Sequence, residues 1–252
     1  MPSKEIEFKG SQNETLAATM DLPENEDPKA TVLFAHCFTC SKNFKVMGNI
    51  TRILADLGFA TFRFDFTGLG ESDGNFSNTN FSSNVEDLIA AHDFLKNNGN
   101  APAILVGHSL GGAAALQAAH FMESVKAVAT IAAPAHPKHV QENFGLKLEE
   151  IEEKGKAEVT LGGRKFTIKK QFIDNLKENY MLDFIKNLNK ALMVFHSPLD
   201  NIVGIENASM IFKAAKHPKS FVSLDKADHL LTEDKDSKYV GKVLATWAEK
   251  YF

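Results

Sequence analysis

Residues 107–112 read GHSLGG, and this stretch decides the fold of the chain. It matches the pattern G-x-S-x-G, in which a serine lies on a sharp turn between a strand and a helix. The apolar run AILV precedes the stretch and the alanine-rich run AAALQAAHFM follows it, as that turn requires. Gly107 and Gly111 are expected where neighbouring backbone passes close to the turn. A serine that only caps a helix is the alternative, but the residues described below favour the strand–turn–helix interpretation.

Eight short apolar runs are typical of strands, and helical patterns separate most of them. These runs are KEIEF (4–8), LAATMDL (16–22), TVLFAH (31–36), ATFRFDF (60–66), AILVGHS (103–109), AVATIAAP (127–134), ALMVFHS (191–197) and SFVSLD (220–225). Such alternation predicts an α/β fold with a doubly wound, mostly parallel sheet and helices on both faces. No repeat or low-complexity linker interrupts the pattern, so residues 1–252 are expected to form one domain.

A long insertion separates the sixth and seventh predicted strands. It exceeds fifty residues, far more than a crossover between strands needs. It contains a charged helical pattern, LKLEEIEEKGK, and a hairpin pattern, AEVTL-GG-RKFTI. Because it leaves the sheet next to the strand that precedes Ser109, it leaves at the edge where ligands bind in such sheets. We therefore expect residues from about 135 to 190 to form a cap over Ser109, with an idle surface insertion as the alternative.

A serine hydroxyl is a weak nucleophile near neutral pH, so it needs a histidine base, and the base needs an acid to fix its tautomer. In this architecture the chain order is serine, acid, histidine. Among nine histidines we favour His229, because it follows the last predicted strand and precedes the last helix. His108 adjoins the serine and is expected to point away from it. His196 ends a strand and could support the site.

Asp200 is the predicted acid. It lies on the loop after the seventh strand, where a Ser-Pro pair signals a turn. Asp225 and Asp228 are rivals, but both lie too near His229 in the sequence to reach its ring easily. A role in capping a turn is the alternative for Asp200.

The loop after the third strand, AHCFTCSK at 35–42, is expected to complete the site. A serine hydrolase of this architecture needs two backbone N–H groups for the oxyanion, one after the nucleophile and one from this loop. We predict that Phe38 and Leu110 supply them, and that the ring of Phe38 forms a wall of the acyl pocket. The further candidates for the substrate pocket are Cys37, Phe144, Phe166 and Phe172.

Both cysteines of the chain, Cys37 and Cys40, lie in this loop with the spacing C-x-x-C. A zinc site would need more cysteines than the chain has, and no metal site is predicted. A thioredoxin-like pair would compete for the turn that the serine site needs, so a redox role is the less favoured alternative. We expect reduced, unbridged thiols, because a disulfide would impose its own turn on the backbone that must orient Phe38.

The composition argues against several classes of protein. Two cysteines in 252 residues are unlike a secreted chain framed by disulfides, and the polar N-terminus has no signal-peptide pattern. No apolar run reaches membrane-spanning length, so no membrane partner is expected. A formal net charge of −4 without a basic tract argues against nucleic acid. We expect a cytoplasmic protein, and the sequence leaves its oligomeric state open.

These stretches resemble the α/β-hydrolase superfamily of the serine esterase type over essentially the whole chain. The similarity is closest to the hydrolase domains fused to OsmC-like domains in some bacterial proteins. It is carried by LFAHCFTCSKNF, FRFDFTGLGESDGNFSNTNFSSNV, GHSLGG, AEVTLGGRKFTIKKQF and HPKSFVSLDKADHLL. The resemblance implies an eight-stranded sheet, no cofactor, and Ser109, His229 and Asp200 as nucleophile, base and acid. The usual His-Gly pair of the oxyanion loop is here His36–Cys37.

The predicted function is hydrolysis of small carboxylic esters through an acyl-enzyme. Ser109 would attack the ester carbonyl while His229 takes its proton, and water would then release the acid. A thioesterase or a small-peptide hydrolase would need the same residues. A non-catalytic binding protein on the same scaffold is the alternative from a different class.

Overall fold

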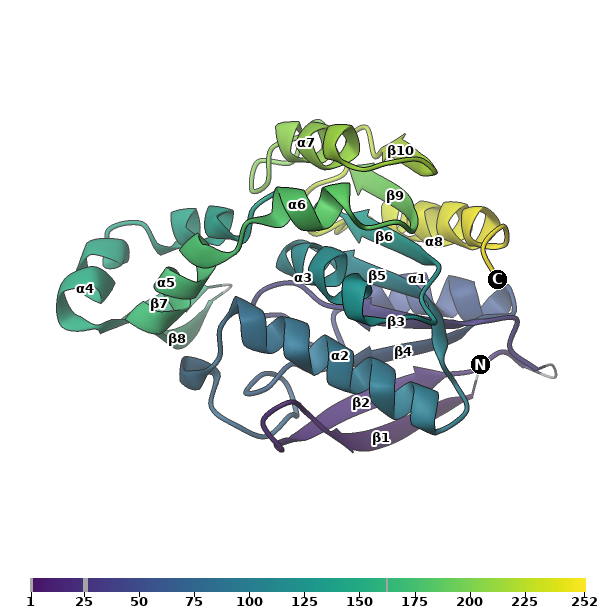
Figure 1. The fold of residues 1–252 in the computed structure, drawn as a ribbon, viewed down its shortest axis with the longest axis horizontal. Helices are drawn as coiled ribbons and strands as arrows, with labels where there is room; N and C mark the ends of the chain where they lie inside the picture. The colour runs from purple at the N-terminus through teal and green to yellow at the C-terminus, as the bar shows by residue number, and fades with distance from the viewer. Residues whose placement is uncertain (1, 25–26, 162) are drawn as a thin grey trace.

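The computed structural model describes residues 2–24, 27–161 and 163–252, and in it eight strands form one sheet (Figure 1). The strands are β1 (Ser3–Lys9), β2 (Thr15–Asp21), β3 (Thr31–Ala35), β4 (Ala60–Phe64), β5 (Pro102–His108), β6 (Ala127–Ile131), β9 (Ala191–His196) and β10 (Lys219–Ser223). Their order is β1-β2-β4-β3-β5-β6-β9-β10, with antiparallel pairing at β1–β2 and β2–β4 and parallel pairing elsewhere. The predicted mostly parallel, eight-stranded sheet is confirmed.

Helices cover both faces of this sheet (Figure 1). The helices that do so are α1 (Lys45–Asp56), α2 (Phe81–Asn97), α3 (Leu110–Ala118), α7 (Glu206–Ala214) and α8 (Asp234–Ala248), with short turns η1 (Phe76–Asn78) and η2 (Ala119–Phe121). Side chains alternate along β5: Ile104 and Val106 join the core under α1 and α8, whereas Leu105 joins the core under α2 and α3. Because both faces are buried, the central strands are apolar along their whole length.

The segment between β6 and β9 contains six short elements. They are η3 (Pro137–Phe144), α4 (Lys147–Lys154), β7 (Lys156–Leu161), β8 (Arg164–Lys169), α5 (Lys170–Glu178) and α6 (Met181–Lys186). Of these, α4, β7, β8 and α5 lie together at one end of the sheet, whereas α6 lies between α3 and α7 (Figure 1). β7 and β8 pair as an antiparallel hairpin, and Gly162 of the expected turn lies outside the described residues.

Helix α5 joins this segment to the body of the protein. The side chain of Asn175 accepts the backbone N–H of Ser82 at 3.0 Å, and Gln171 donates to the carbonyl of Thr79 at 2.8 Å. Phe172 is buried in the same core as α2 and α3. The segment is therefore held on the α2 side of the sheet by polar and apolar contacts together.

In the described ranges no helix is both long and apolar enough to cross a membrane.

Candidate active site

Ser109 lies on a strained turn between β5 and α3. Its backbone has φ 53° and ψ −126°, a left-handed conformation that a residue with a side chain rarely adopts. A Cβ on Gly107 would collide with the carbonyl oxygen of Gly111, and a Cβ on Gly111 would collide with that of His36. The N–H of Ser109 donates to the carbonyl of Ile131 at 2.9 Å. These contacts place the serine side chain at the carboxyl edge of the sheet.

The three side chains predicted as a triad form one hydrogen-bonded line. Ser109 Oγ lies 3.0 Å from His229 Nε2, and His229 Nδ1 lies 2.8 Å from Asp200 Oδ2. They follow β5, β10 and β9, whose carboxyl ends meet at the same edge. Because a carboxylate can only accept, Nδ1 carries the proton and Nε2 is free to accept the serine proton.

Asp200 is buried and held by three donors. Oδ1 accepts the N–H groups of Ile202 and Val203, each at 2.9 Å, and Oδ2 accepts from His229. Burial works to raise the pKa of Asp200, but the hydrogen bonds from His229, Val203 and Ile202 outweigh it and hold that pKa below its usual value. The carboxylate is therefore ionised at neutral pH and can orient the imidazole.

The rival acids have partners in their own loops. Asp228 accepts the N–H of Thr232 at 2.9 Å and its hydroxyl at 2.6 Å. Asp225 accepts the hydroxyl of Ser223 at 3.2 Å. Both aspartates are exposed, as expected for carboxylates that cap turns at the surface.

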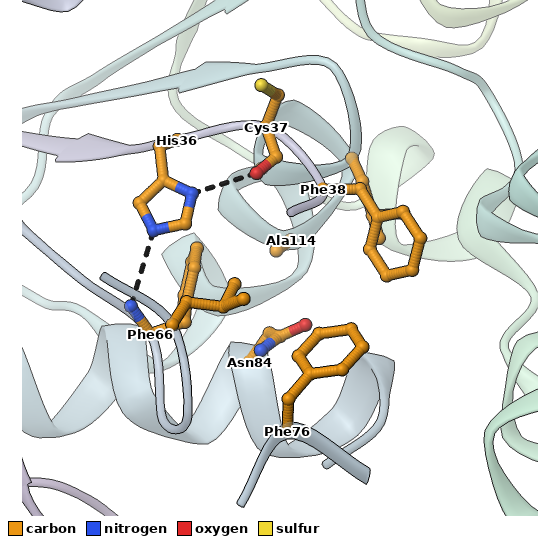
Figure 2. Close-up of a pocket in the computed structure, with 10 residues that line it drawn as sticks. His36, Cys37, Phe38, Phe66, Phe76, Asn84 and Ala114 are labelled. Atoms are coloured by element: carbon orange, nitrogen blue, oxygen red, sulfur yellow. Dashed lines mark hydrogen bonds between the residues drawn. The ribbon is translucent and has the colours of Figure 1, made fainter. Parts of the chain in front are cut away.

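His36 orients the loop that carries Phe38. Its Nδ1 lies 2.8 Å from the carbonyl oxygen of Cys37, and its Nε2 accepts the N–H of Phe66 at 3.3 Å (Figure 2). Burial lowers the pKa of His36, so the ring is neutral and Nδ1 donates. In a trans peptide the N–H points opposite to the carbonyl, so the N–H of Phe38 points away from His36. In the described ranges neither Phe38 nor Leu110 donates its N–H to a backbone carbonyl.

The expectation of reduced thiols is wrong in this structure, because Cys37 and Cys40 form a disulfide with Cα atoms 5.3 Å apart. The N–H of Cys40 donates to the carbonyl of Cys37 at 3.1 Å, and Thr39 has φ 63°, so residues 37–40 form one tight turn. The expectation assumed that such a turn excludes the orientation of Phe38. Both coexist because the two lone pairs of the Cys37 carbonyl accept from Cys40 and from His36.

Two cavities meet at Phe38. The outer one is an open cleft lined by Cys37, Phe38, Thr39, Cys40, Ser41, Asn43, Phe44, Lys45, Ser109, Leu161, Arg164, Ile202, His229 and Leu230. The inner one, behind the loop after β3, is lined by His36, Cys37, Phe38, Phe66, Leu69, Phe76, Asn84, Leu110, Gly111 and Ala114 (Figure 2). Asn84 places the only carboxamide of this inner lining beside the ring of Phe76 (Figure 2).

Only some of the residues predicted to line the substrate pocket line a cavity in the structure. Cys37 lines both cavities, whereas the three insertion phenylalanines line neither. Phe144 and Phe172 pack on Phe38 with ring centroids 6.2 and 5.4 Å away, and Phe166 packs on Phe76 at 5.0 Å. These three rings therefore form a second layer of side chains behind Phe38 and Phe76, which line the cavities. Sequence reasoning missed Phe76 and Arg164, for which the strand and helix patterns hold no signal.

Known proteins share the sequence and the fold of this chain. Residues 26–153 match the family described as serine aminopeptidase, S33. The chain belongs to this family of serine hydrolases. An esterase domain of a Rhodothermus marinus protein is 48% identical, with a TM-score of 0.81 and coverage of 100% of this chain and 99% of that one.

Two further proteins share less of the sequence. The mouse palmitoyl-protein thioesterase ABHD10, a mitochondrial protein, is 32% identical over 71% of this chain, and the match spans 62% of the mouse protein. Est1E from Butyrivibrio proteoclasticus, solved with ferulic acid, is 21% identical with a TM-score of 0.84, covering 97% of this chain and 98% of its own. At that identity Est1E shows the fold, an α/β hydrolase.

Two more buried histidines hold the loops of this hydrolase. His108 Nε2 donates to the backbone carbonyl of His229 at 2.8 Å, and His196 Nε2 donates to that of Val203 at 2.7 Å. Burial lowers the pKa of both rings, that of His108 to about 4, so both are neutral donors at neutral pH. With His36, each of these histidines follows or ends a parallel strand and fixes a loop that carries a predicted site residue.

Stability should fall in acid because of these rings. Between pH 6.5 and about 4 the unfolded chain binds a proton at residue 108 that the folded chain does not, so stability falls as pH falls through that window. For His108 the loss is at most roughly 3 kcal/mol. His108→Asn should flatten the dependence of the melting temperature on pH, measured by calorimetry from pH 7 to 4. Parallel curves for parent and variant would show that His108 does not contribute.

Proposed function

We propose that this protein hydrolyses carboxylic esters of small molecules through an acyl-enzyme. The hydrogen-bonded line from Ser109 through His229 to Asp200 carries the proposal; it lies at a strained turn beside the N–H groups of Phe38 and Leu110, which bind no backbone carbonyl of the described residues. The membership in a serine hydrolase family and the related esterase domain support the same class of reaction. These residues are the proposed nucleophile, base and acid.

The steps follow from the positions of the protons. His229 Nε2 takes the proton of Ser109 as Oγ attacks the carbonyl carbon, and the N–H groups of Phe38 and Leu110 receive the oxyanion. The positive N-terminal end of α3 adds to this stabilisation. The imidazolium, paired with Asp200, then protonates the leaving alcohol. Water then attacks the acyl carbon while His229 takes its proton; the bond to Oγ breaks, the acid leaves, and His229 returns the proton to Ser109.

Residues from about 135 to 190 are proposed as a cap on a single hydrolase domain. Leu161 and Arg164, at the end of the β7–β8 hairpin, line the cleft together with Ser109. A wall of this kind limits the length of a bound chain. We expect turnover of p-nitrophenyl esters to rise and then fall as the acyl chain lengthens. Leu161→Ala shortens this wall, so the acyl-chain length with the highest kcat/KM should become longer across the series.

Labelling with a fluorophosphonate probe tests the proposed function. The parent should be labelled at Ser109, located by peptide mass spectrometry, and should hydrolyse short esters faster than matched anilides. A thioester series belongs in the same assay, because a relative of this chain is named a thioesterase and the same residues would serve. Absence of labelling together with absence of hydrolysis in a folded protein would favour a binding protein instead.

A cytoplasmic location and the closeness to OsmC-fused hydrolase domains stay predictions. The small-molecule substrate expected of the hydrolase family is the partner proposed for the cleft.

A further inference from the structure

Arg164 lies in the cleft beside Ser109 and has no acidic partner among the residues that the structure describes. We propose that Arg164 binds an anionic group of the substrate, a carboxylate or a phosphate, so that the preferred ester carries a negative charge. This inference rests on the proposed ester hydrolysis and names the class of ester.

The structure holds Arg164 over the cleft. It is the first residue of β8 and lies opposite Leu161 in the hairpin. One Nη2 N–H donates to the carbonyl of Thr39 in the oxyanion loop, and the guanidinium lies 5.5 Å from the centroid of Phe166. A guanidinium has five N–H donors, so this single hydrogen bond leaves others for a ligand.

Among the described residues Arg164 is unpaired, unlike the two lysines nearest to it in the hairpin and the cleft. Lys165, the next residue of the hairpin, is paired with Glu158 at 2.8 Å, and Lys45, which also lines the cleft, is paired with Asp234 at 2.8 Å. Within residues 2–24, 27–161 and 163–252, Arg164 forms no ion pair.

The rest of the lining favours the same class of ligand. No aspartate or glutamate lines the described part of the cleft, so an anion bound there would meet no carboxylate of the lining. Its other walls are largely apolar and include Phe38, Phe44, Ile202 and Leu230. The planar fork of an arginine matches the two oxygens of a carboxylate or phosphate. The cleft therefore suits an ester with an apolar part beside the reacting carbonyl and an anionic group near the cap hairpin.

A purely structural role for Arg164 is the competing explanation. The hydrogen bond to Thr39 connects the cap hairpin to the loop of Phe38, so its loss could disturb the site for every substrate. Such a disturbance would lower the rates for neutral and charged esters alike. The ratio of the two rates therefore separates anion binding from clamping.

The experiment compares matched esters on four proteins. One series carries a carboxylate or a carboxamide on the acyl part, and a second carries a carboxylate, a phosphate or a carboxamide on the alcohol part. The proteins are the parent, Arg164→Gln, Arg164→Lys and the control Lys165→Gln. The parent should prefer the anionic ester in at least one series. Arg164→Gln should lower that preference in kcat/KM by about tenfold to a hundredfold, because a hydrogen bond to a charged group is lost.

The controls make the result decisive. Arg164→Lys should keep part of the preference, and Lys165→Gln should keep all of it, because that charge is already paired. The alcohol series distinguishes a carboxylate from a phosphate as the preferred anion. An unchanged preference in Arg164→Gln, in both series, would overturn the inference and leave Arg164 as a clamp.

Calorimetry separates this inference from the proposed function. The affinities of Ser109→Ala, and of Ser109→Ala combined with Arg164→Gln, for the anionic and the neutral ester can be measured without turnover. A tighter complex with the anionic ester that depends on Arg164 would support anion binding even if no ester were hydrolysed. Equal affinities would overturn it even if esterase activity were found.

Discussion

Ser109→Ala should abolish ester hydrolysis and leave the protein folded. Loss of a triad nucleophile typically lowers turnover by about 10⁶-fold, because the remaining groups can only bind and polarise the ester. The fold should survive, since the variant loses the hydrogen bond between Oγ and His229 but keeps the backbone bond from residue 109 to the carbonyl of Ile131. A positive φ is open to alanine in this structure, as Ala132 with φ 51° shows.

The test combines kcat on a short p-nitrophenyl ester with thermal unfolding. Ser209→Ala, on an exposed position of α7, is the matched control and should behave like the parent. Activity of Ser109→Ala within tenfold of the parent would remove Ser109 from the role of nucleophile. A fall in activity accompanied by loss of cooperative unfolding would point instead to a damaged turn.

Asp200→Asn should lower turnover by about 10⁴-fold through the tautomer of His229. In the parent, Oδ1 accepts two backbone N–H groups, those of Ile202 and Val203. An asparagine would keep its oxygen at those donors and turn its NH₂ toward His229. The imidazole would then accept at Nδ1 and carry its proton on Nε2, where it cannot take the proton of Ser109.

The comparison with Asp228→Asn decides between the candidate acids. Asp228 bonds Thr232 within its own loop, so that change should alter kcat far less. Both variants are assayed on the same ester, with unfolding as the check of structure. If Asp228→Asn proves to be the damaging change, the acid is not Asp200.

The sequence by itself determined the architecture and the places of the chemical groups. Strand and helix patterns arise from local side-chain periodicity, so the order of elements and the parallel sheet could be predicted from them. The motif around Ser109 is local too, because a serine with a glycine two residues before it and another two residues after it can be recognised without knowing any distant contact. Asp200 and His229 could be chosen because parallel strands bring their following loops to one edge.

Only the tertiary structure determined the contacts between segments that are distant in the sequence. Arg164 reaches Thr39 from 125 residues away, and the insertion phenylalanines stack behind Phe38 and Phe76 instead of lining the cleft. The disulfide turn coexists with the hydrogen bond from His36 because that ring and the N–H of Cys40 both bind the carbonyl oxygen of Cys37. Such contacts depend on where whole elements pack, to within an ångström or so, and local periodicity carries no information on those distances.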